Sequence, residues 1–97
     1  MPYKLVIGST AKRQLSEMPS DVRSAVVDKL LDISEKAEDM LRPAVFPPYP
    51  PGYLVHDFFV KTIDNDDDLQ WFVVIIVKKS DEGTEFQVYS LSFRTFP

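Results

Sequence analysis

The stretch from residue 69 to residue 79 constrains the fold most, because apolar side chains occupy both its odd and its even positions. The odd positions hold Trp71, Val73, Ile75 and Val77, and the even positions hold Phe72, Val74 and Ile76. β-Branched and aromatic residues favour strands, and a strand that is apolar on both sides must be covered on both faces. We therefore predict a central strand over residues 69–79.

Two further β-prone stretches, residues 53–63 and 85–96, lie on either side of this strand in the sequence. The links between the three, residues 64–68 and 80–84, are short and rich in turn-forming Asp, Asn and Gly. This arrangement predicts a three-stranded antiparallel meander. In the last stretch we expect Tyr89, Leu91 and Phe93 on one face and Ser90, Ser92 and Arg94 on the other.

The first 40 residues predict a strand followed by a helix hairpin. Residues 3–7 alternate well enough for a short strand. Over residues 11–18 the apolar positions recur at helical spacing, and Pro19 then interrupts the pattern. Ser20 is a good N-cap for a second, longer helix that ends between residues 36 and 40. Its apolar positions are Val22, Val26, Leu30 and Ile33, so both helices present an apolar face that must be buried.

The segment from residue 43 to residue 51 holds five of the eight prolines of the chain, which excludes a helix or a central strand there. Within it, residues 50–53 match the P-P-x-Y ligand of WW domains. Because such short matches arise easily in proline-rich segments, we interpret the segment as a stiff connector whose aromatic residues cover the sheet.

Length and composition indicate one folded domain spanning residues 1–97. An apolar fraction of 44% and a charged fraction of 27% are ordinary for a soluble globular protein. The absence of cysteine excludes a disulfide framework and a thiolate metal site. We find no apolar run near the roughly 20 residues that span a bilayer and no signal-peptide pattern, so we expect a cytoplasmic protein without a membrane partner.

The charge balance argues against a protein that acts mainly by gripping a phosphate backbone. The chain holds 11 basic and 15 acidic side chains, and its net charge is −4. Residues 1–42 hold 7 of each sign, whereas residues 43–97 hold 4 basic and 8 acidic groups. The electrostatic attraction that dominates nucleic-acid affinity therefore has the wrong overall sign in the second half, unless a local basic patch survives within it.

The order of these elements resembles that of the RelE/ParE superfamily of bacterial toxins from type II toxin–antitoxin modules. The residues that carry the resemblance are 3–7 leading into 10–15, then 18–23, and the closing 88–94. The resemblance implies an α+β fold: an N-terminal strand, a helix hairpin and a three-stranded antiparallel meander. The helices then pack on one face of a sheet of about four strands.

The resemblance also implies a toxin that an antitoxin-like small protein neutralises. RelE-like members of that family cleave messenger RNA on the ribosome by attack of a 2′-hydroxyl on the adjacent phosphate, without metal or organic cofactor. This chemistry needs proton transfer and cations that stabilise the phosphate. Carried over by position, Arg94 is the catalytic candidate that holds the phosphate. From the residues themselves, His56 for proton transfer and Lys78 are further catalytic candidates, and Lys61 and Lys79 are candidates for RNA binding.

Each candidate also has an ordinary structural interpretation. His56, the only histidine, alternates with apolar residues and is favoured to pack against the sheet or lie on the surface. A solvated role suits Arg94 about equally well, and Lys78 and Lys79 are typical of charges that blunt the end of a sheet. Asp64, Asp66 and Asp68 imitate the start of a calcium loop, but the glycine and glutamate that the motif requires are missing, so we expect a solvated acidic hairpin.

The sequence leaves the function open between two classes. The family has cations in the loop before the meander and an arginine at the start of the middle strand, whereas this chain has residues 43–52 without a cation and Trp71-Phe72-Val73. The alternative is therefore a catalytically inactive protein-binding module, whose open sheet face is covered by a partner or by a second copy of the chain. Most aromatic residues must be core, and exposed ones would favour this alternative. Gyrase poisoning is a third reading, and no residue selects it.

Overall fold

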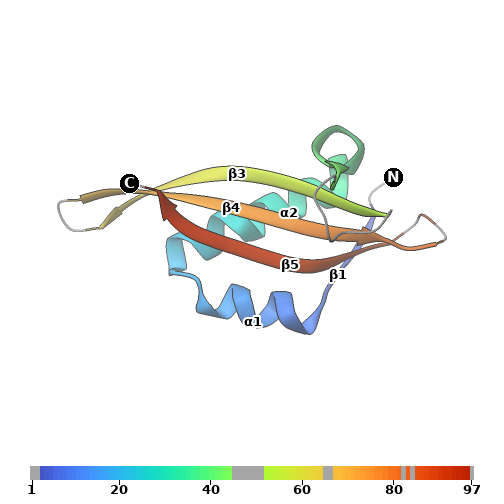
Figure 1. Cartoon of the computed structure of the whole chain (residues 1–97), viewed down its shortest axis with the longest axis horizontal. Coiled ribbons are helices and arrows are strands. Elements are labelled where there is room, and N and C mark those ends of the chain that lie inside the picture. Colours follow the sequence, from blue (N-terminus) through green and yellow to red (C-terminus); the bar gives the residue numbers. More distant parts are fainter. Residues whose placement is uncertain (1–2, 45–51, 65–66, 82, 84, 97) are drawn as a thin grey trace.

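The computed structural model describes residues 3–44, 52–64, 67–81, 83 and 85–96, with only the backbone at 62–64, 67–69 and 96. Its elements follow the predicted order (Figure 1). They are β1 (Lys4–Ile7), α1 (Ser9–Glu17), α2 (Ser20–Met40), β2 (Arg42–Pro43), β3 (Tyr53–Asp64), β4 (Asp67–Lys79) and β5 (Glu85–Phe96). The α+β class, the helix hairpin and the three-stranded meander are confirmed.

The strands form one sheet in the order β1-β5-β4-β3-β2. Strand β4 is therefore central, as its two apolar sides predict. β1 pairs in parallel with β5, and the other neighbours are antiparallel. The sheet has one strand more than expected, because Arg42 and Pro43 pair with Val55 and Leu54. Proline is tolerated at this place because the strand is at the edge of the sheet.

Both helices pack on one face of the sheet, which we call the helix face (Figure 1). The apolar positions of α2 that share one helical side, Val22, Val26, Leu30 and Ile33, are buried. From the sheet, Val73, Ile75 and Val77 of β4 and Val88 and Leu91 of β5 are fully buried in the same cluster. Burial of side chains of this size contributes roughly 1.5–3 kcal/mol each, so this layer is the main source of stability.

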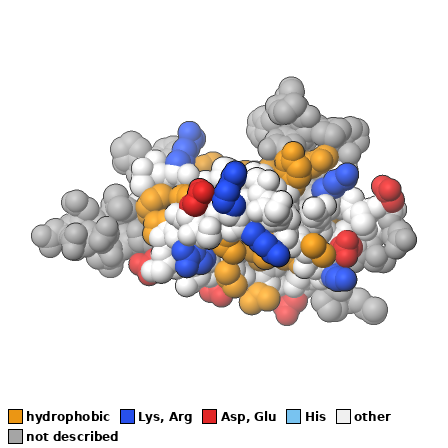
Figure 2. Space-filling view, turned by 90° about the horizontal axis from the view of Figure 1, so that it is seen from below, with side chains coloured by type: hydrophobic (Ala, Val, Ile, Leu, Met, Phe, Trp, Pro, Cys, Tyr) orange, Lys and Arg blue, Asp and Glu red, His pale blue; other side chains and the backbone are white. Residues whose placement is uncertain are grey.

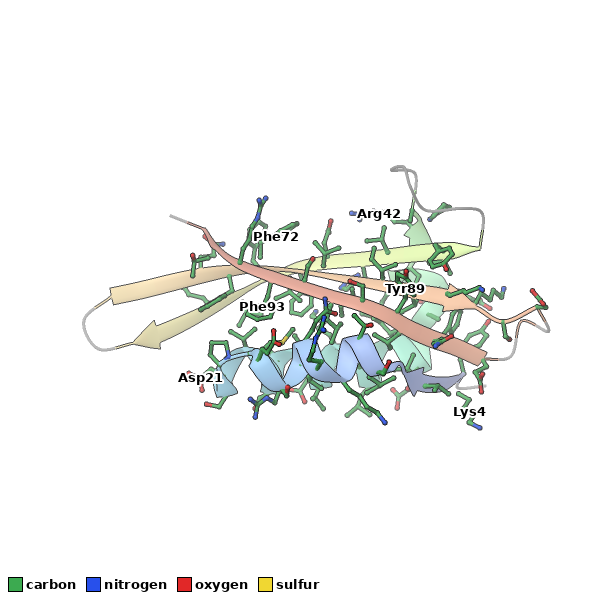
Figure 3. All side chains as sticks on the ribbon, turned by 60° about the horizontal axis from the view of Figure 1, so that its bottom comes forward. Lys4, Asp21, Arg42, Phe72, Tyr89 and Phe93 are labelled. Carbon is green, nitrogen blue, oxygen red and sulfur yellow. The ribbon has the colours of Figure 1, made fainter. Side chains whose placement is uncertain are left out.

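The opposite face of the sheet, which we call the outer face, carries neither of the two described helices (Figure 1). The expectation that β4 is covered on both faces is therefore only half right. Ile76 is buried on the outer face, but Phe72 and Val74 are half-buried. In Figure 3, Phe72 lies on the outer side of the sheet, whereas Phe93 lies between the sheet and α1. An apolar side without a helix over it leaves part of its surface available for contacts with other molecules.

Strand β5 contains a β-bulge that the sequence analysis missed. Val77 pairs with Val88, but the neighbouring Ile76 pairs with Ser90, so Tyr89 is an extra residue. Tyr89 was expected on the side of Leu91 and Phe93, and this was wrong, because the bulge breaks the two-residue alternation between them. Leu91 is fully buried, whereas Tyr89 is 48% exposed.

The N-terminal segment is attached to α2 near a break in that helix. Lys36 has non-helical dihedral angles within α2, and the backbone N–H of Tyr3 donates to the carbonyl of Ser34 at 2.7 Å. The Tyr3 hydroxyl donates to Glu38 Oε1 at 2.8 Å, on the far side of the break. Tyr3 thereby contacts both parts of α2. Among the described residues, neither helix is long and apolar enough to cross a membrane.

Candidate functional site

Three side chains form a row across the outer face, one from each of its three long strands. Phe59 of β3 pairs with Phe72 of β4, and Phe72 pairs with Arg94 of β5. The two rings are 5.0 Å apart between centroids, and the guanidinium carbon of Arg94 lies 5.9 Å from the centre of the Phe72 ring. Phe59 is 54% exposed. The row therefore presents an aromatic surface with a cation at one end, and we call it the aromatic row.

A second cation lies beside this row. Lys61 follows Phe59 by two residues on β3, so it shares the outer face, and it is exposed. Between Phe72 and Arg94 the surface is hollowed, forming an open depression of about 310 Å³ that Val74 and Ser92 also line. The depression combines an aromatic wall, a hydroxyl and a guanidinium. Guanidinium groups bind phosphates through two parallel hydrogen bonds, so this place is suited to an anionic ligand.

The carboxylate next to the row is held by an arginine. Asp57 pairs with Val74 in the register of β3 and β4, one row further along the outer face. Its Oδ2 lies 2.6 Å from Nη2 of Arg42, the first residue of β2. The ion pair reduces the repulsion that this carboxylate would exert on an anion bound at Arg94. Arg42 is not predictable as a site residue from the sequence, because nothing in its local pattern predicts a paired edge strand.

A second group of aromatic and basic side chains lies at the other end of the outer face. Tyr53 and Tyr89 meet edge to face with centroids 5.3 Å apart, and Lys78 Nζ lies 5.8 Å from the centre of the Tyr53 ring. Figure 3 shows Tyr89 and Arg42 toward this end of the sheet and Phe72 toward the other. Lys78 comes six positions after Phe72 on β4, which corresponds to roughly 20 Å. The outer face thus has two aromatic and cationic clusters.

The structure brings together only part of the candidate residues. Arg94, Lys61 and Lys78 share the outer face. Lys79 follows Lys78 and pairs with the buried Phe86, so its position belongs to the helix-face side at the end of the sheet. Both lysines line a polar depression of about 230 Å³ that also includes Asp81 and Glu85. Carboxylates in the lining make this depression a poor place for a phosphate.

His56 is separated from the other candidates by the thickness of the sheet. It pairs with the fully buried Ile75, so it lies on the helix face. Its Nδ1 lies 3.1 Å from the carbonyl oxygen of Met40, and its ring stacks on Phe58 with centroids 5.8 Å apart. Because a carbonyl only accepts, Nδ1 carries the proton in this contact. Nε2 is buried and has no hydrogen-bond partner among the described residues. This geometry is that of a packing residue at the end of α2.

The part of the chain that is described contains no obvious metal-binding site. Over those residues, no three side chains of the ligand-forming types His, Asp and Glu gather in one place. Residues 65 and 66 of the expected acidic hairpin lie outside the described residues, and so does the proline-rich segment 45–51.

Comparison with known proteins shows the fold. No protein-family model matches the sequence, and no curated protein matches it. Among solved structures, the chain is similar to one in the toxin–antitoxin complex RelBE2 from Mycobacterium tuberculosis, with 19% identity and a TM-score of 0.73 over 97% of this chain and 100% of that one. It is also similar to a free E. coli RelE toxin in which two arginines are mutated to alanine, with 18% identity and a TM-score of 0.58 over 95% of this chain and 83% of that one. The chain has a RelE-like fold.

Proposed function

We propose that this chain is the toxin-like component of a type II toxin–antitoxin module and contacts single-stranded messenger RNA through its outer face. The observation that carries the proposal is the aromatic row, in which Phe59, Phe72 and Arg94 lie side by side on an exposed sheet surface. Proteins that bind single strands combine aromatic platforms for the bases with cations for the backbone. The RelE-like fold supports the same assignment.

On this proposal the aromatic row contacts a base through its exposed ring, and its cation and the neighbouring cations contact phosphates. A base stacks on the exposed ring of Phe59, which is worth about 1–3 kcal/mol. Arg94 holds the following phosphate, and Lys61 adds charge beside it. The net negative charge of the chain does not prevent RNA binding, because affinity depends on the charges that face the ligand. Lys78, roughly 20 Å away along β4, contacts a phosphate further along the strand.

We further propose ribosome-dependent cleavage of the message at Arg94. The 2′-hydroxyl gives its proton to water, and its oxygen forms a bond to phosphorus. The bond from phosphorus to the 5′-oxygen breaks and this oxygen takes a proton from water, which leaves a cyclic phosphate and a 5′-hydroxyl. Arg94 stabilises the charge that develops on the phosphoryl oxygens. His56 lies on the other face, and Asp57 is ion paired to Arg42, so the chain contributes mainly charge stabilisation. We therefore expect cleavage activity below that of a site with its own general acid and base.

Tight induction of the chain alone in a bacterial host tests the proposal. We expect arrested growth and cleavage of translated messages from the parent, and loss of both from Arg94→Ala. The matched control is Lys12→Ala, which removes an exposed cation from α1 and leaves the outer face unchanged. Equal toxicity of the Arg94 variant and the parent contradicts the role of Arg94. Arrest with DNA damage and intact messages points to gyrase instead of RNA.

An antitoxin-like partner is part of the same proposal, and an apolar groove between α2 and β1 supports it. The groove measures about 320 Å³ and is lined by Leu5 and Ile7 of β1 and by Val27 and Leu31 of α2, among others. Leu31 is 61% exposed and Val27 is 40% exposed. On the side that carries α1, hydrophobic side chains lie exposed among charged ones (Figure 2). β1 is also an edge strand, which can accept one more strand.

The charges beside the groove indicate the chemistry of the partner. Asp28 and Glu35 are exposed and lie three residues before and four residues after Leu31, hence next to it on the helix surface. They favour a segment that combines apolar side chains with lysine or arginine, and they disfavour a second copy of this acidic chain. We expect Leu31→Lys to abolish co-purification with a co-encoded small protein. Asp21→Asn, an equal change of charge near the start of α2, should leave it intact.

The second candidate function is a protein-binding module that lacks catalysis. The exposure of Phe59 and Tyr89 favours it, because large exposed aromatic side chains are typical of interface anchors. In this case induction is harmless, the protein is folded, and a partner or a second copy covers the outer face. Phe59→Ser then disrupts the complex, whereas Arg94→Ala does so only weakly. Harmless induction together with a monomer that captures no partner contradicts both functions.

A further inference from the structure

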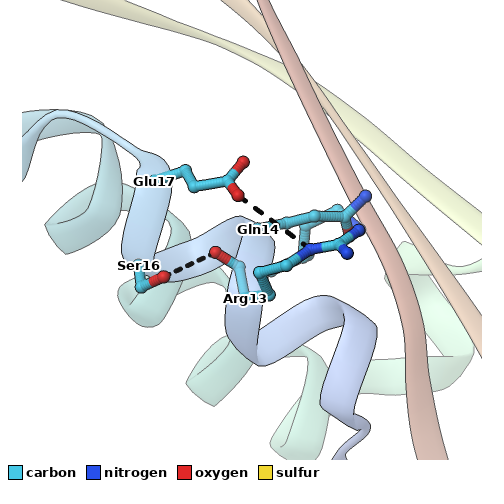
Figure 4. A network of polar contacts seen from close by, with 5 residues as sticks. Arg13, Gln14, Ser16 and Glu17 are labelled. Atoms are coloured by element: carbon cyan, nitrogen blue, oxygen red, sulfur yellow. Dashed lines mark hydrogen bonds and ion pairs between the residues drawn. The ribbon is translucent and has the colours of Figure 1, made fainter.

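The side chain of Gln14 in α1 is joined to the backbone of β5 across 77 residues of sequence. Its Oε1 accepts a hydrogen bond of 2.7 Å from the backbone N–H of Leu91, and the contact is partly buried. Gln14 lies on α1 next to β5, beside a surface network around Arg13 (Figure 4). In this network the Arg13 side chain pairs with Glu17, and the Arg13 carbonyl oxygen accepts a hydrogen bond from the Ser16 hydroxyl. The hydrogen bond of Gln14 thus joins α1 to a strand far away in the sequence.

The bond falls where the edge of β5 loses its neighbouring strand. β1 pairs with β5 only as far as Ile7 and Val88, and the N–H of Gly8 then donates to the carbonyl of Val88 at 3.1 Å. Beyond this point α1 replaces β1 beside β5 (Figure 1). The Leu91 N–H points to this side, and Leu91 is fully buried, so the group needs a partner from the protein. Gln14 supplies that partner.

The bond also lies directly after the bulge that decides the orientation of Arg94. In a regular strand, residues 88 and 94 share a face, because they are six positions apart. Val88 is fully buried on the helix face, so a regular β5 would turn Arg94 toward the helices. The extra residue at Tyr89 reverses the alternation and places Arg94 opposite Phe72 on the outer face. The orientation of Arg94 therefore depends on β5 keeping its register after the bulge.

We infer that Gln14 is a positioning residue, which fixes β5 after its bulge and thereby holds Arg94 over the ring of Phe72. The consequence for RNA binding rests on the proposed function, whereas the placement of Arg94 does not. Gln14 is remote from the outer face and contacts no ligand there. Its loss leaves a buried N–H without an acceptor, which favours local opening of residues 91–96 over the native register.

Two variants at this position separate the hydrogen bond from mere packing. Gln14→Leu keeps the approximate size of the side chain and removes the acceptor, whereas Gln14→Glu retains an oxygen that accepts from Leu91. For Gln14→Leu we expect the Leu91 amide to exchange with solvent about tenfold faster in NMR measurements. We also expect the proton signals of the Arg94 side chain to lose the shift caused by the Phe72 ring. Gln14→Glu should restore both properties.

Binding of a short single-stranded RNA, measured in the parent and in an Arg94→Ala background, then tests the link to function. We expect Gln14→Leu to weaken binding severalfold in the parent and to have no further effect without Arg94. An unchanged ring-current shift in Gln14→Leu overturns the inference, and so does equal weakening in both backgrounds. If Arg94→Ala itself leaves RNA binding unchanged, the proposed function fails, while the Leu91 exchange and the Arg94 shift still decide the role of Gln14.

Discussion

Arg23 of α2 donates a hydrogen bond from Nε to the carbonyl oxygen of Leu15 in α1, at 3.0 Å. Its Nη2 also lies 3.1 Å from the Ser16 carbonyl and 2.9 Å from the Met18 carbonyl. The last carbonyls of a helix lack partners within the helix, and a positive charge there is also favoured by the helix dipole. One guanidinium therefore caps α1 and closes the helix hairpin around Pro19.

Replacing Arg23 with methionine should lower the free energy of unfolding by about 1–2 kcal/mol, because the three carbonyls lose a charged donor. Urea denaturation monitored by circular dichroism measures the change. Arg13→Met is the matched control, since its 3.9 Å pair with Glu17 is exposed and contributes little. Equal stability of the two variants would show that the Arg23 contacts do not stabilise the hairpin.

Adding a methyl group at Gly8 should destabilise the fold by about 1–3 kcal/mol through overpacking. A Cβ atom built at Gly8 lies 3.1 Å from the Val88 carbonyl oxygen and 3.3 Å from the Gln87 side chain. Gly8 joins β1 to α1, and the crowded oxygen is the one that accepts the hydrogen bond from the Gly8 N–H. The midpoint of thermal unfolding of Gly8→Ala checks this prediction. Lys12→Ala, at an exposed position of α1, should leave the midpoint nearly unchanged.

The hydrogen bond that Tyr3 donates to Glu38 raises the pKa of the Tyr3 hydroxyl above its ordinary value of about 10, and burial and the carboxylate charge act in the same direction. The pKa of Tyr3 is therefore higher in the folded than in the unfolded protein. The contact with Glu38 stabilises the fold fully below about pH 10, and this stabilisation is lost as the pH rises through the folded-state pKa. The difference between ultraviolet titrations of the parent and of Tyr3→Phe reports the ionisation of Tyr3. We expect this ionisation at a higher pH than that of a free tyrosine. Ionisation at or below the ordinary pKa would refute the effect of Glu38.

His56→Gln should reduce stability and leave the outer face intact. The variant disturbs the contact with Met40 and the stacking on Phe58, for an expected loss of about 1–3 kcal/mol. RNA binding measured well below the unfolding transition should match the parent, because the side chain lies on the helix face. Loss of RNA binding with unchanged stability would instead support the role in proton transfer that the sequence suggests.

The sequence predicts the fold well where a repeating pattern meets a single physical requirement. The two apolar sides of residues 71–77 require a central strand, and β4 occupies that place. The helical spacing of Val22, Val26, Leu30 and Ile33 predicts the buried side of α2. Such patterns are informative because burial selects one register and excludes the others.

The errors lie where one residue alters the alternation. Tyr89 was assigned to the wrong side because the count assumed a regular strand, although Phe86 and Val88 have a different parity from Leu91 and Phe93. That change of parity within one apolar strand is the signal of the bulge. Strand β2 left no such signal, since two residues that include a proline show no alternation.

The candidate site was predictable only in part. Period-two counting correctly places Arg94 on the face of Ser92, and it places His56 with Leu54 and Phe58. The alternation does not show which of the two sheet faces the helices cover. His56 is enclosed and Phe59 is exposed because the helices cover the face of His56. The pairing of Asp57 with Arg42 and of Gln14 with Leu91 joins distant segments, so it depends on the completed topology.

The parallel pairing of β1 with β5 has a consequence for synthesis of the chain. Residues 4–7 are translated before their partners, residues 85–88, which emerge roughly 80 residues later. The helix hairpin can form early from local contacts, but the sheet closes only when β5 is released. Until then the aromatic row has no Arg94, so a nascent chain lacks the RNA contact that we propose for it.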